Sequence, residues 1–487
     1  MKPALTRTWV RATGLPNRHP GAVGAGLRLL GGMTVAALVG CATPGPGDAV
    51  SALPAQWLPA GTPPLQVLVD ADARRASDAR RRQLLAEPLT ESRAVALALD
   101  GSPALQALLA EGWRLQADQA RSGSPTRIGL SFERIVEDGA ASWTRSLSFG
   151  LSDLLTWPLR QAASERARAA SRLRLARDVL ALQAAARQQW VRAVAARQAE
   201  AYREQVLEVA EAGAELARRM QAVGNFSRLQ RSREELAVLD AGANLSRARQ
   251  VARAESEALV RLLGLTEADA AALKWPERLP DVPLQPRDAG AVARDAVRER
   301  IDLQLAAAEW SVASGMPWRS EAVDVEASVI RERSPDGARG RGAEIALSLP
   351  WPTEWAQRRA GARAAELAAA ARLEQARVDA ASLLRERYAG YRSAHELARQ
   401  HRDQLVPLRK SITDDMLLRY NGMLVGVFEL LADARAQVAS VIAALDAERD
   451  FWLADAALDA AVLGVPAAMP GAAPAAMAAE SSSSGGH

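Results

Sequence analysis

The sequence predicts a mainly α-helical protein with a β-barrel contribution, built from a duplicated unit of two β-strands and a long, coiled-coil-like helical hairpin. Two observations predict this fold class: unrelated features recur at one fixed spacing, and alanine-rich stretches without proline run far beyond ordinary helix length. The recurring features are each 198 residues apart: Asp138-Gly139 and Asp336-Gly337, Trp157 and Trp355, Gly224 and Gly422. The first repeat is expected at residues 84–280 and the second at residues 281–465.

The composition favours long helices with thin apolar seams over a thick globular core. Apolar residues make up 49% of the 487 residues, but most of them are alanine, and aromatic residues make up only 4%. The net charge of +4 is small for this length, and the arginines are interspersed with Asp and Glu. This charge balance argues against a nucleic acid as a partner.

The N-terminal 40 residues have the layout of a secretion signal. Five basic residues precede a short apolar run, residues 29–40, that ends at the single cysteine of the chain, Cys41. Leu38-Val39-Gly40-Cys41 resembles a bacterial lipobox, so Cys41 is the expected lipidation site; the alternative is that this cysteine is incidental. With Cys41 lipidated, no thiol remains for disulfides or catalysis.

Residues 41–83 are rich in Pro, Gly, Ala and small polar residues and are expected to form an extended arm. A short helix is expected at residues 91–100. Ser102-Pro103 begins a second helical stretch that continues to Arg121, and Ser122–Pro125 ends it.

Each repeat then contains two segments in which apolar and polar residues alternate. Ile128, Leu130 and Phe132 share one side of the first segment, and Gly129 and Ser131 share the other. The four expected strands are residues 126–136, 142–154, 322–331 and 343–351. Arg145 interrupts the apolar side of its strand, which a membrane tolerates only near its surface.

The strand pattern favours a membrane barrel. A water-soluble sandwich gives the same alternation, but segments near the ~9–11 residues of a tilted transmembrane strand, in an exported protein, favour the membrane. Four strands cannot close a barrel, and open strand edges do not occur in lipid. Several chains must therefore contribute strands to one barrel.

The long helical segments are expected to form two hairpins, residues 159–264 and 355–464. An outgoing helix from Leu159 to Gln221 would be ~95 Å long, and Pro407 is expected to kink its counterpart. Gly224-Asn225 breaks the first hairpin and Asn421-Gly422 the second, because these residues accept left-handed backbone angles. Leu263-Gly264 and Leu463-Gly464 end the return helices.

Taken together, these features resemble the TolC-like outer-membrane efflux protein family. The resemblance covers about residues 84–465 and is carried by the duplicated architecture, the lipobox, and two related tip sequences, Arg219–Gly224 and Leu418–Gly422. It implies a homotrimer whose strands form one 12-stranded β-barrel, continued by a periplasmic α-barrel. It also implies an outer-membrane exit duct, lipid-anchored, that works with a periplasmic adaptor and an inner-membrane pump. Arg419–Gly422, Val427–Leu431 and Arg449–Trp452 are similar to members associated with heavy-metal resistance.

The resemblance places the functional residues at the hairpin tips. The expected adaptor-docking residues are Gly224, Asn225, Phe226, Ser227, Gly422, Met423, Leu424 and Val425. The alternative for the glycines is that they only turn the chain. Acidic rings often narrow the closed end in this family, and the candidate gate carboxylates are Glu429 and Asp433, with Glu234 and Glu235 in the first repeat. Solvated helix charge is the competing interpretation.

Nothing in the sequence predicts an enzyme, a cofactor or a metal site. His395 and His401 have no second ligand at metal spacing, and Met416 and Met423 are expected to pack rather than to bind a soft metal. Phosphate-loop, dinucleotide and nucleophile-elbow motifs are missing from the sequence. Two other classes remain open: a lipid-anchored periplasmic coiled-coil scaffold without a channel, and a lipid-anchored enzyme. Residues 466–487 are expected to be a disordered tail.

Overall fold

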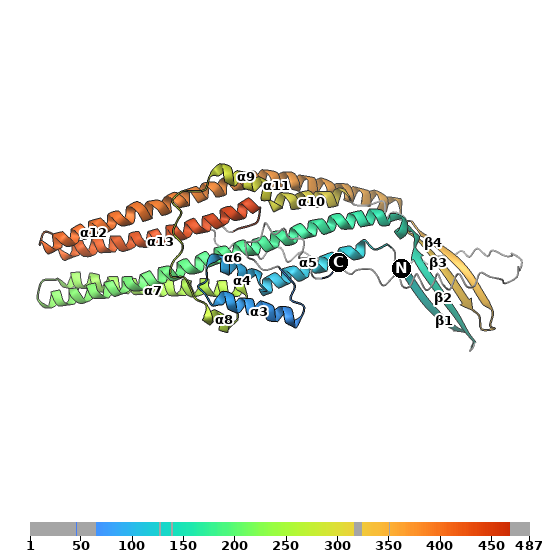
Figure 1. Ribbon diagram of the computed structural model, residues 1–487, viewed down its shortest axis with the longest axis horizontal. Helices are drawn as coiled ribbons and strands as arrows, with labels where there is room; N and C mark the ends of the chain where they lie inside the picture. The colour runs from blue at the N-terminus through green and yellow to red at the C-terminus, as the bar shows by residue number, and fades with distance from the viewer. Residues whose placement is uncertain are drawn as a thin grey trace. The chain divides into compact units, whose positions relative to one another are not determined.

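The computed structural model describes residues 45, 65–125, 128–137, 140–315, 324–349 and 351–467 (Figure 1). The chain divides into two units, residues 1–44 and 45–487, and every described residue belongs to the second. The predictions for the signal segment, for Cys41 and for the tail from residue 468 onward lie outside the described residues.

In the described part of the chain, three helices precede the first strand. They are α3 (Ala71–Leu85), α4 (Glu91–Leu99) and α5 (Pro103–Ser122). The side chains of Asp70, Thr90 and Ser102 accept hydrogen bonds from the first turns of these helices and so fix where each begins. The expectation of an extended arm up to residue 83 is wrong for α3, because its Asp cap and five arginines suit a helix.

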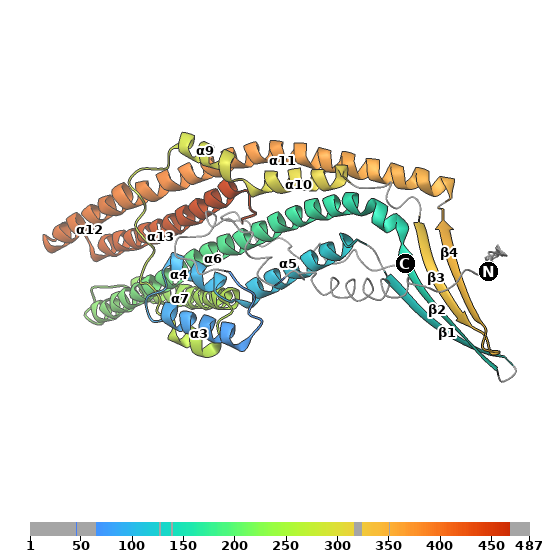
Figure 2. The ribbon, with the colours of Figure 1, turned by 45° about the vertical axis from the view of Figure 1, so that its right-hand side comes forward.

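The four strands form one antiparallel sheet in the order β1-β2-β3-β4 (Figure 2). Their bounds are β1 Ile128–Glu137, β2 Ala140–Gly150, β3 Asp324–Arg333 and β4 Arg339–Ser348. Strand β2 therefore ends at Gly150, not at residue 154 as expected, since the following residues already belong to a helix. Strands β2 and β3 pair directly, so the sheet joins the two repeats.

The register sorts the strand residues into one mostly apolar and one polar face. Leu130, Leu147, Val329 and Ala343 lie directly opposite one another across the sheet and hence share a face. Leu130 is 69% exposed, so this face is uncovered in the single chain. The neighbouring row on the other face is Gly129, Ser148, Ser328 and Glu344.

Helix α6 (Leu151–Ala222) follows the sheet, and helix α7 (Arg228–Leu263) runs back and packs against α6. Helix α6 has 72 residues and is thus ~108 Å long, and it begins before Pro158 rather than after it. The short helix α8 (Glu267–Ala272) follows. In the first repeat, the sheet and the hairpin tip therefore lie at opposite ends of α6 (Figure 1).

The second repeat has the same order of elements. Helices α9 (Ala289–Glu299) and α10 (Ile301–Ser314) precede the strands, and α11 (Pro352–Gln400), α12 (Val406–Asn421) and α13 (Val427–Leu463) form the hairpin. A π-helical turn, His401–Leu405, separates α11 from α12 immediately before Pro407. The helix is irregular at the expected place, because Pro407 has no N–H to donate.

Equivalent hydrogen bonds fasten the two long outgoing helices to the segments before α4 and α9. The Trp190 indole N–H donates to the Leu89 carbonyl at 2.7 Å, and the Tyr388 hydroxyl donates to the Arg287 carbonyl at 2.9 Å. The two donors are 198 residues apart, and so are the two acceptors, as the sequence repeat requires. The largest buried cluster surrounds Trp190, with Leu99, Leu109 and Val179, and a second cluster surrounds Tyr391 and Phe451.

Within the part of the chain that the structure describes, no helix combines the length and the apolar character that a membrane span needs.

The return helices of both repeats end at a left-handed glycine, and this geometry gives a stability prediction. Gly264 has φ 65°, and a Cβ on it would overlap Pro103 at the start of α5. We expect Gly264→Ala to lower the free energy of unfolding by at least ~1–2 kcal/mol. Gly242, inside α7, has open space around its Cβ position, so Gly242→Ala should stabilise by ~0.5–1 kcal/mol. Thermal unfolding of both variants checks this, and equal melting temperatures would contradict it.

Candidate functional site

The tip of the first hairpin is a tight, capped turn. Gly224 is left-handed at φ 82°, and the Asn225 N–H donates to the Met220 carbonyl at 2.9 Å, which closes the end of α6. The Ser227 side chain and Gln230 form a capping box that begins α7. Asn225 and Ser227 are exposed, but Phe226 is buried. Of these residues, Phe226 is therefore not available to a partner.

The tip of the second hairpin closes one residue later than the 198-residue spacing implies. Gly422 has an ordinary φ of −81°, and the left-handed residue is Met423, at φ 58°. The Leu424 N–H donates to the Arg419 carbonyl at 2.9 Å, as Asn225 does to Met220. The expectation that Gly422 is the backbone equivalent of Gly224 is thus wrong, since Met423 takes that conformation. Met423 and Leu424 are 94% and 78% exposed.

The two hairpins are joined near their tips by an aromatic pair and an ion pair. The rings of Phe226 and Phe428 stack with centroids 4.6 Å apart, beside buried Ala217 and Val427. Nearby, the buried carboxylate of Glu234 on α7 pairs with Arg435 on α13. Of the four candidate gate carboxylates, Glu234 thus joins the two repeats.

Each of the other three candidate carboxylates is either exposed or paired within its own hairpin. Glu429 is exposed in the first turn of α13, and Asp433 accepts a hydrogen bond of 2.6 Å from the Thr413 hydroxyl on α12. Glu235 pairs with Arg231 on its own helix at 3.3 Å. Their role as a gate stays a prediction.

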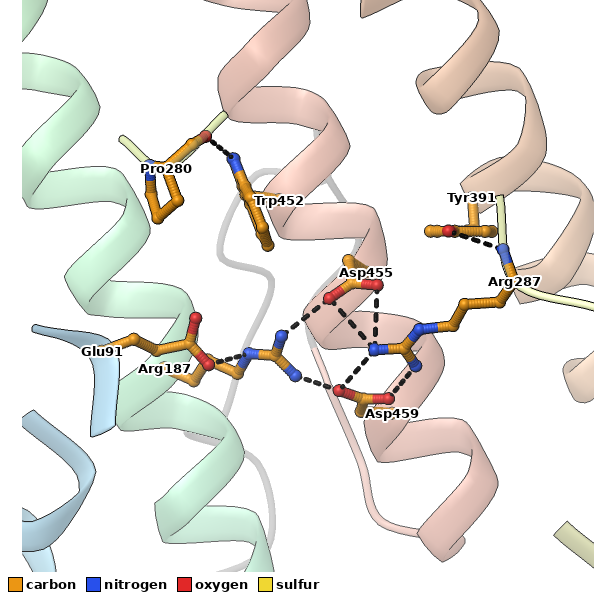
Figure 3. Close-up of polar contacts among 8 residues, drawn as sticks. All are labelled: Glu91, Arg187, Pro280, Arg287, Tyr391, Trp452, Asp455 and Asp459. Atoms are coloured by element: carbon orange, nitrogen blue, oxygen red, sulfur yellow. Dashed lines mark hydrogen bonds and ion pairs between the residues drawn. The ribbon is translucent and has the colours of Figure 1, made fainter. Parts of the chain in front are cut away.

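A second junction, further along the hairpins, is a cluster of five charged side chains (Figure 3). Arg187 on α6 contacts Glu91 on α4 at 2.5 Å and Asp455 on α13 at 2.7 Å, and also pairs with Asp459. Arg287, from the segment of the second repeat that precedes α9, contacts Asp455 at 3.1 Å and pairs with Asp459. The Arg287 N–H also donates to the Tyr391 hydroxyl on α11. The cluster therefore connects the two repeats.

The charge cluster holds three carboxylates and two guanidinium groups, so one negative charge is in excess. Burial and the neighbouring Asp459 raise the pKa of Asp455, and burial raises the pKa of Glu91. Burial also acts to raise the pKa of Asp459, but hydrogen bonds and charge from Arg287 and Arg187 outweigh it and hold that pKa below its ordinary value of 3.8. Glu91 and Asp455 are thus the carboxyl groups of the cluster that bind a proton more readily, while Asp459 stays ionised.

Sequence reasoning missed this cluster. The available signal was the pair Asp455 and Asp459, one turn apart on a helix segment otherwise rich in Ala and Leu, and Arg187 within a similar alanine-rich stretch. Residues of α6, α7 and α13 also line a cleft of about 430 Å³, which contains none of the five cluster residues and has Arg192, Arg203 and Arg247 in its lining.

His395 packs within the core of the second repeat and contacts a backbone carbonyl. The His395 ring nitrogen Nε2 lies 2.9 Å from the Pro283 carbonyl, and its ring packs edge-on against Phe451. Among the described residues, no group of three or more His, Cys, Asp and Glu side chains could hold a metal ion.

The arrangement of sheet and hairpins matches that of solved outer-membrane channels. The CmeC outer membrane channel of Campylobacter jejuni aligns with a TM-score of 0.66 at 13% identity, covering 77% of this chain and 85% of that one. The outer membrane protein VceC of Vibrio cholerae aligns with a TM-score of 0.61 at 17% identity, covering 80% and 97%. The chain has a TolC-like fold. The open MtrE outer membrane channel of Neisseria gonorrhoeae also aligns, with a TM-score of 0.61 at 17% identity, covering 76% and 88%.

The TolC-like fold confirms the family resemblance at the level of architecture. No family model matches the sequence, and a search of curated proteins gives no significant match. The likeness therefore lies in the fold, since the identities to the solved channels are below 20%.

The two tip turns give a paired prediction. Met423 is strained in a left-handed conformation and Gly224 is not, so Met423→Gly should stabilise its tip by ~1 kcal/mol and Gly224→Ala should destabilise its tip by a similar amount. Hydrogen exchange of the Leu424 and Asn225 amides measures each turn separately. Gly422→Ala is the control, because its backbone is not left-handed and its Cβ position makes only ordinary contacts, the nearest at 3.5 Å. Unchanged protection in both test variants would contradict the assignment.

The charge cluster predicts opposite effects for its two aspartates. Asp455→Asn removes the excess negative charge and should leave the melting temperature at pH 7 unchanged or higher. Asp459→Asn leaves two guanidinium groups short of a partner and should lower stability, by less than the ~3–5 kcal/mol of a fully buried pair because its side chain is 35% exposed.

The same cluster predicts the pH dependence. A raised carboxyl pKa, as at Asp455, contributes stability that is present at low pH and lost as pH rises through that pKa. The lowered pKa of Asp459 contributes stability that is present above 3.8 and lost as pH falls through the folded-state value. The contribution of the cluster to wild-type stability should therefore be greatest in mild acid, and Asp455→Asn should make stability fall less as the pH rises. Melting temperatures measured from pH 3 to pH 8 test this, and a variant profile that parallels the wild type would refute it.

Proposed function

We propose that this protein is the outer-membrane exit duct of a tripartite efflux system, acting as a homotrimer with a periplasmic adaptor and an inner-membrane pump. The observation that carries the proposal is the four-stranded sheet, which is apolar on one face and polar on the other, and whose two outer edges pair with no other described strand. Such a sheet is complete only when copies of the chain pair β1 of one with β4 of the next. Three copies would supply the 12 strands of a small barrel.

The strand lengths support a membrane setting. The four strands have 10, 11, 10 and 10 residues, which fits the ~9–11 residues of a tilted membrane-spanning strand. Phe132 and Ile345 on the apolar face are 74% and 72% exposed in the single chain. The competing scaffold function, with a small water-soluble sheet, would leave this face in water, which is costly.

The helices support the same closure between copies. Helices α6 and α13 pack against each other, while α7 packs on α6 and α12 packs on α13, so α7 and α12 lie at the two outer sides. Both outer helices expose large apolar side chains along their length. These are Leu229, Leu236, Leu239 and Val251 on α7, and Leu408, Ile412, Leu417 and Leu418 on α12. Contact between α7 of one copy and α12 of the next would cover both sets and continue the barrel as a helical duct.

The polar face would line the conduit. Its acidic side chains are Glu133, Asp324, Glu326, Glu332 and Glu344. In the strands, all arginines lie on the other face. A duct lined by carboxylates favours cations and passes cargo without a chemical step. The carboxylate lining is also compatible with metal-ion cargo, as the similarity to heavy-metal resistance proteins suggests.

The N-terminal segment and the two hairpin tips have proposed roles as well. The signal segment would direct export, and the lipid on Cys41 would anchor the mature protein at the outer membrane in addition to the barrel. The exposed apolar residues Met423 and Leu424, with Gly224 and Asn225, would dock the adaptor at the far end of α6 and α12, since exposed apolar side chains at a tip favour a protein contact.

One pair of substitutions in neighbouring positions tests the barrel. Leu147→Arg places a charge on the apolar face and should cost ~2–4 kcal/mol per chain if that face contacts lipid at mid-depth. Ser148→Arg, one residue on, points into the polar face, in the same row as Glu344, and should be tolerated. Native mass spectrometry of detergent-purified protein measures the amount of trimer. Equal trimer levels for both variants would mean that the faces are assigned wrongly, and a monomeric wild type that stays soluble without detergent would favour the scaffold.

A further inference from the structure

The apolar face of the sheet carries a second feature that the duct does not explain, which is a concentration of arginines at one end. Arg145 interrupts the apolar side of β2, and the register places every other strand arginine on the same face. The six residues, named here the arginine belt, are Arg134, Arg145, Arg331, Arg333, Arg339 and Arg341. The described acidic side chains of the strands lie on the opposite face, so no strand carboxylate on this face balances them.

The belt places like charges side by side. Arg145, Arg331 and Arg341 lie directly opposite one another on β2, β3 and β4, with neighbouring strands ~4.8 Å apart. Arg333 and Arg339 form the next row. Like charges in directly opposed positions destabilise a sheet. The ion pairs found among the described residues include none of the six, and all six are accessible. This arrangement is therefore unfavourable unless an anion from outside the chain neutralises it.

The belt lies at the turn end of the sheet. The chain reverses between β3 and β4 at residues 334–338, next to Arg333 and Arg339, while the helices attach at the other end of the strands. The apolar rows of the same face, with Leu130, Leu147 and Val329, lie between the belt and the helices. In addition, the Arg134 guanidinium lies over the Trp143 ring at 5.2 Å, and tryptophan is typical of membrane surfaces.

We propose that the arginine belt binds the phosphate groups of lipid headgroups in the leaflet at the turn end of the barrel. Guanidinium groups bind phosphate oxygens through two parallel hydrogen bonds, and a row of them suits a headgroup with more than one phosphate. The adjacent apolar rows would contact the acyl chains of the same lipid, which is why a phosphorylated amphiphile fits this face better than a free anion. The proposal rests on the duct function above, because it takes this face to be the lipid-facing one.

The test compares lipid binding by two matched triple variants of the full chain, purified as trimers in detergent. The first is Arg145→Gln with Arg331→Gln and Arg341→Gln, which removes the central row. The control is Arg363→Gln with Arg377→Gln and Arg392→Gln, which removes three exposed arginines from α11. Native mass spectrometry measures the binding of a bis-phosphorylated glycolipid and of the same glycolipid without phosphates.

We expect the belt variant to bind the phosphorylated glycolipid roughly a hundredfold more weakly than the wild type, and the control variant to bind it as the wild type does. The dephosphorylated glycolipid should bind weakly to all three proteins. Inorganic phosphate in millimolar excess should not compete; if it displaces the lipid completely, the belt is a site for free phosphate. Equal binding of the phosphorylated glycolipid by the belt variant and the wild type would overturn the proposal.

A conservative variant keeps the test informative if the glutamine variant does not assemble. Replacing the same three arginines by lysine retains the charge but loses the paired hydrogen bonds, so its affinity should lie between those of the other two proteins. If the lysine variant binds the phosphorylated glycolipid at least as tightly as the wild type, the belt acts only through its positive charge. The proposed paired hydrogen bonds from guanidinium to phosphate would then be refuted. The failure of this proposal can be distinguished from the failure of the proposed duct function. A wild type that stays soluble without detergent refutes the duct function. A detergent-dependent trimer that binds both glycolipids equally refutes only lipid-phosphate binding by the arginine belt.

Discussion

The structure depends on one constraint, which is that a single chain leaves its backbone hydrogen bonding and its apolar surfaces incomplete. Among the described residues, no strand lies beside the outer edges of β1 and β4, and the outer helices α7 and α12 expose apolar side chains. In lipid, an unpaired strand edge is costly because no water can satisfy its N–H and carbonyl groups. The strand layer and the helix layer are therefore both incomplete on their outer sides, and the assembly proposed above would cover both through one kind of contact between copies.

The duplication explains the fold, but the functional features come from places where the repeats differ. Arg287 occupies the position that Leu89 has in the first repeat, and both carbonyls accept the equivalent hydrogen bond from a long helix. Only in the second repeat does that position carry a charge, which enters the cluster with Arg187, Asp455 and Asp459. The tips diverge in a similar way, since Met423 takes the conformation that glycine takes at Gly224. Breaks in the symmetry thus give the two hairpins different properties.

The sheet separates charge as well as polarity. Arginines lie only on the face with the apolar rows and the described carboxylates only on the polar face, although both kinds of residue occur in every repeat. A two-residue period makes this separation possible, since a shift of the register by one residue would exchange the faces. The two faces of the sheet therefore carry opposite charge, and in the proposed barrel they would face the inside and the outside.

The sequence by itself determined the duplication, the strand pairs, the long hairpins and the approximate position of the tips, because spacing and periodicity are local properties of the chain. It did not determine that α3 is helical, that β2 ends at Gly150, or that the second tip turns at Met423, since caps and turn closure depend on neighbouring backbone groups. The charge cluster and the arginine belt needed the tertiary structure. Glu91 and Asp459 are 368 residues apart, and strand arginines from both repeats become neighbours only when β2 pairs with β3. Contacts over such separations follow from packing and register, which no local pattern encodes.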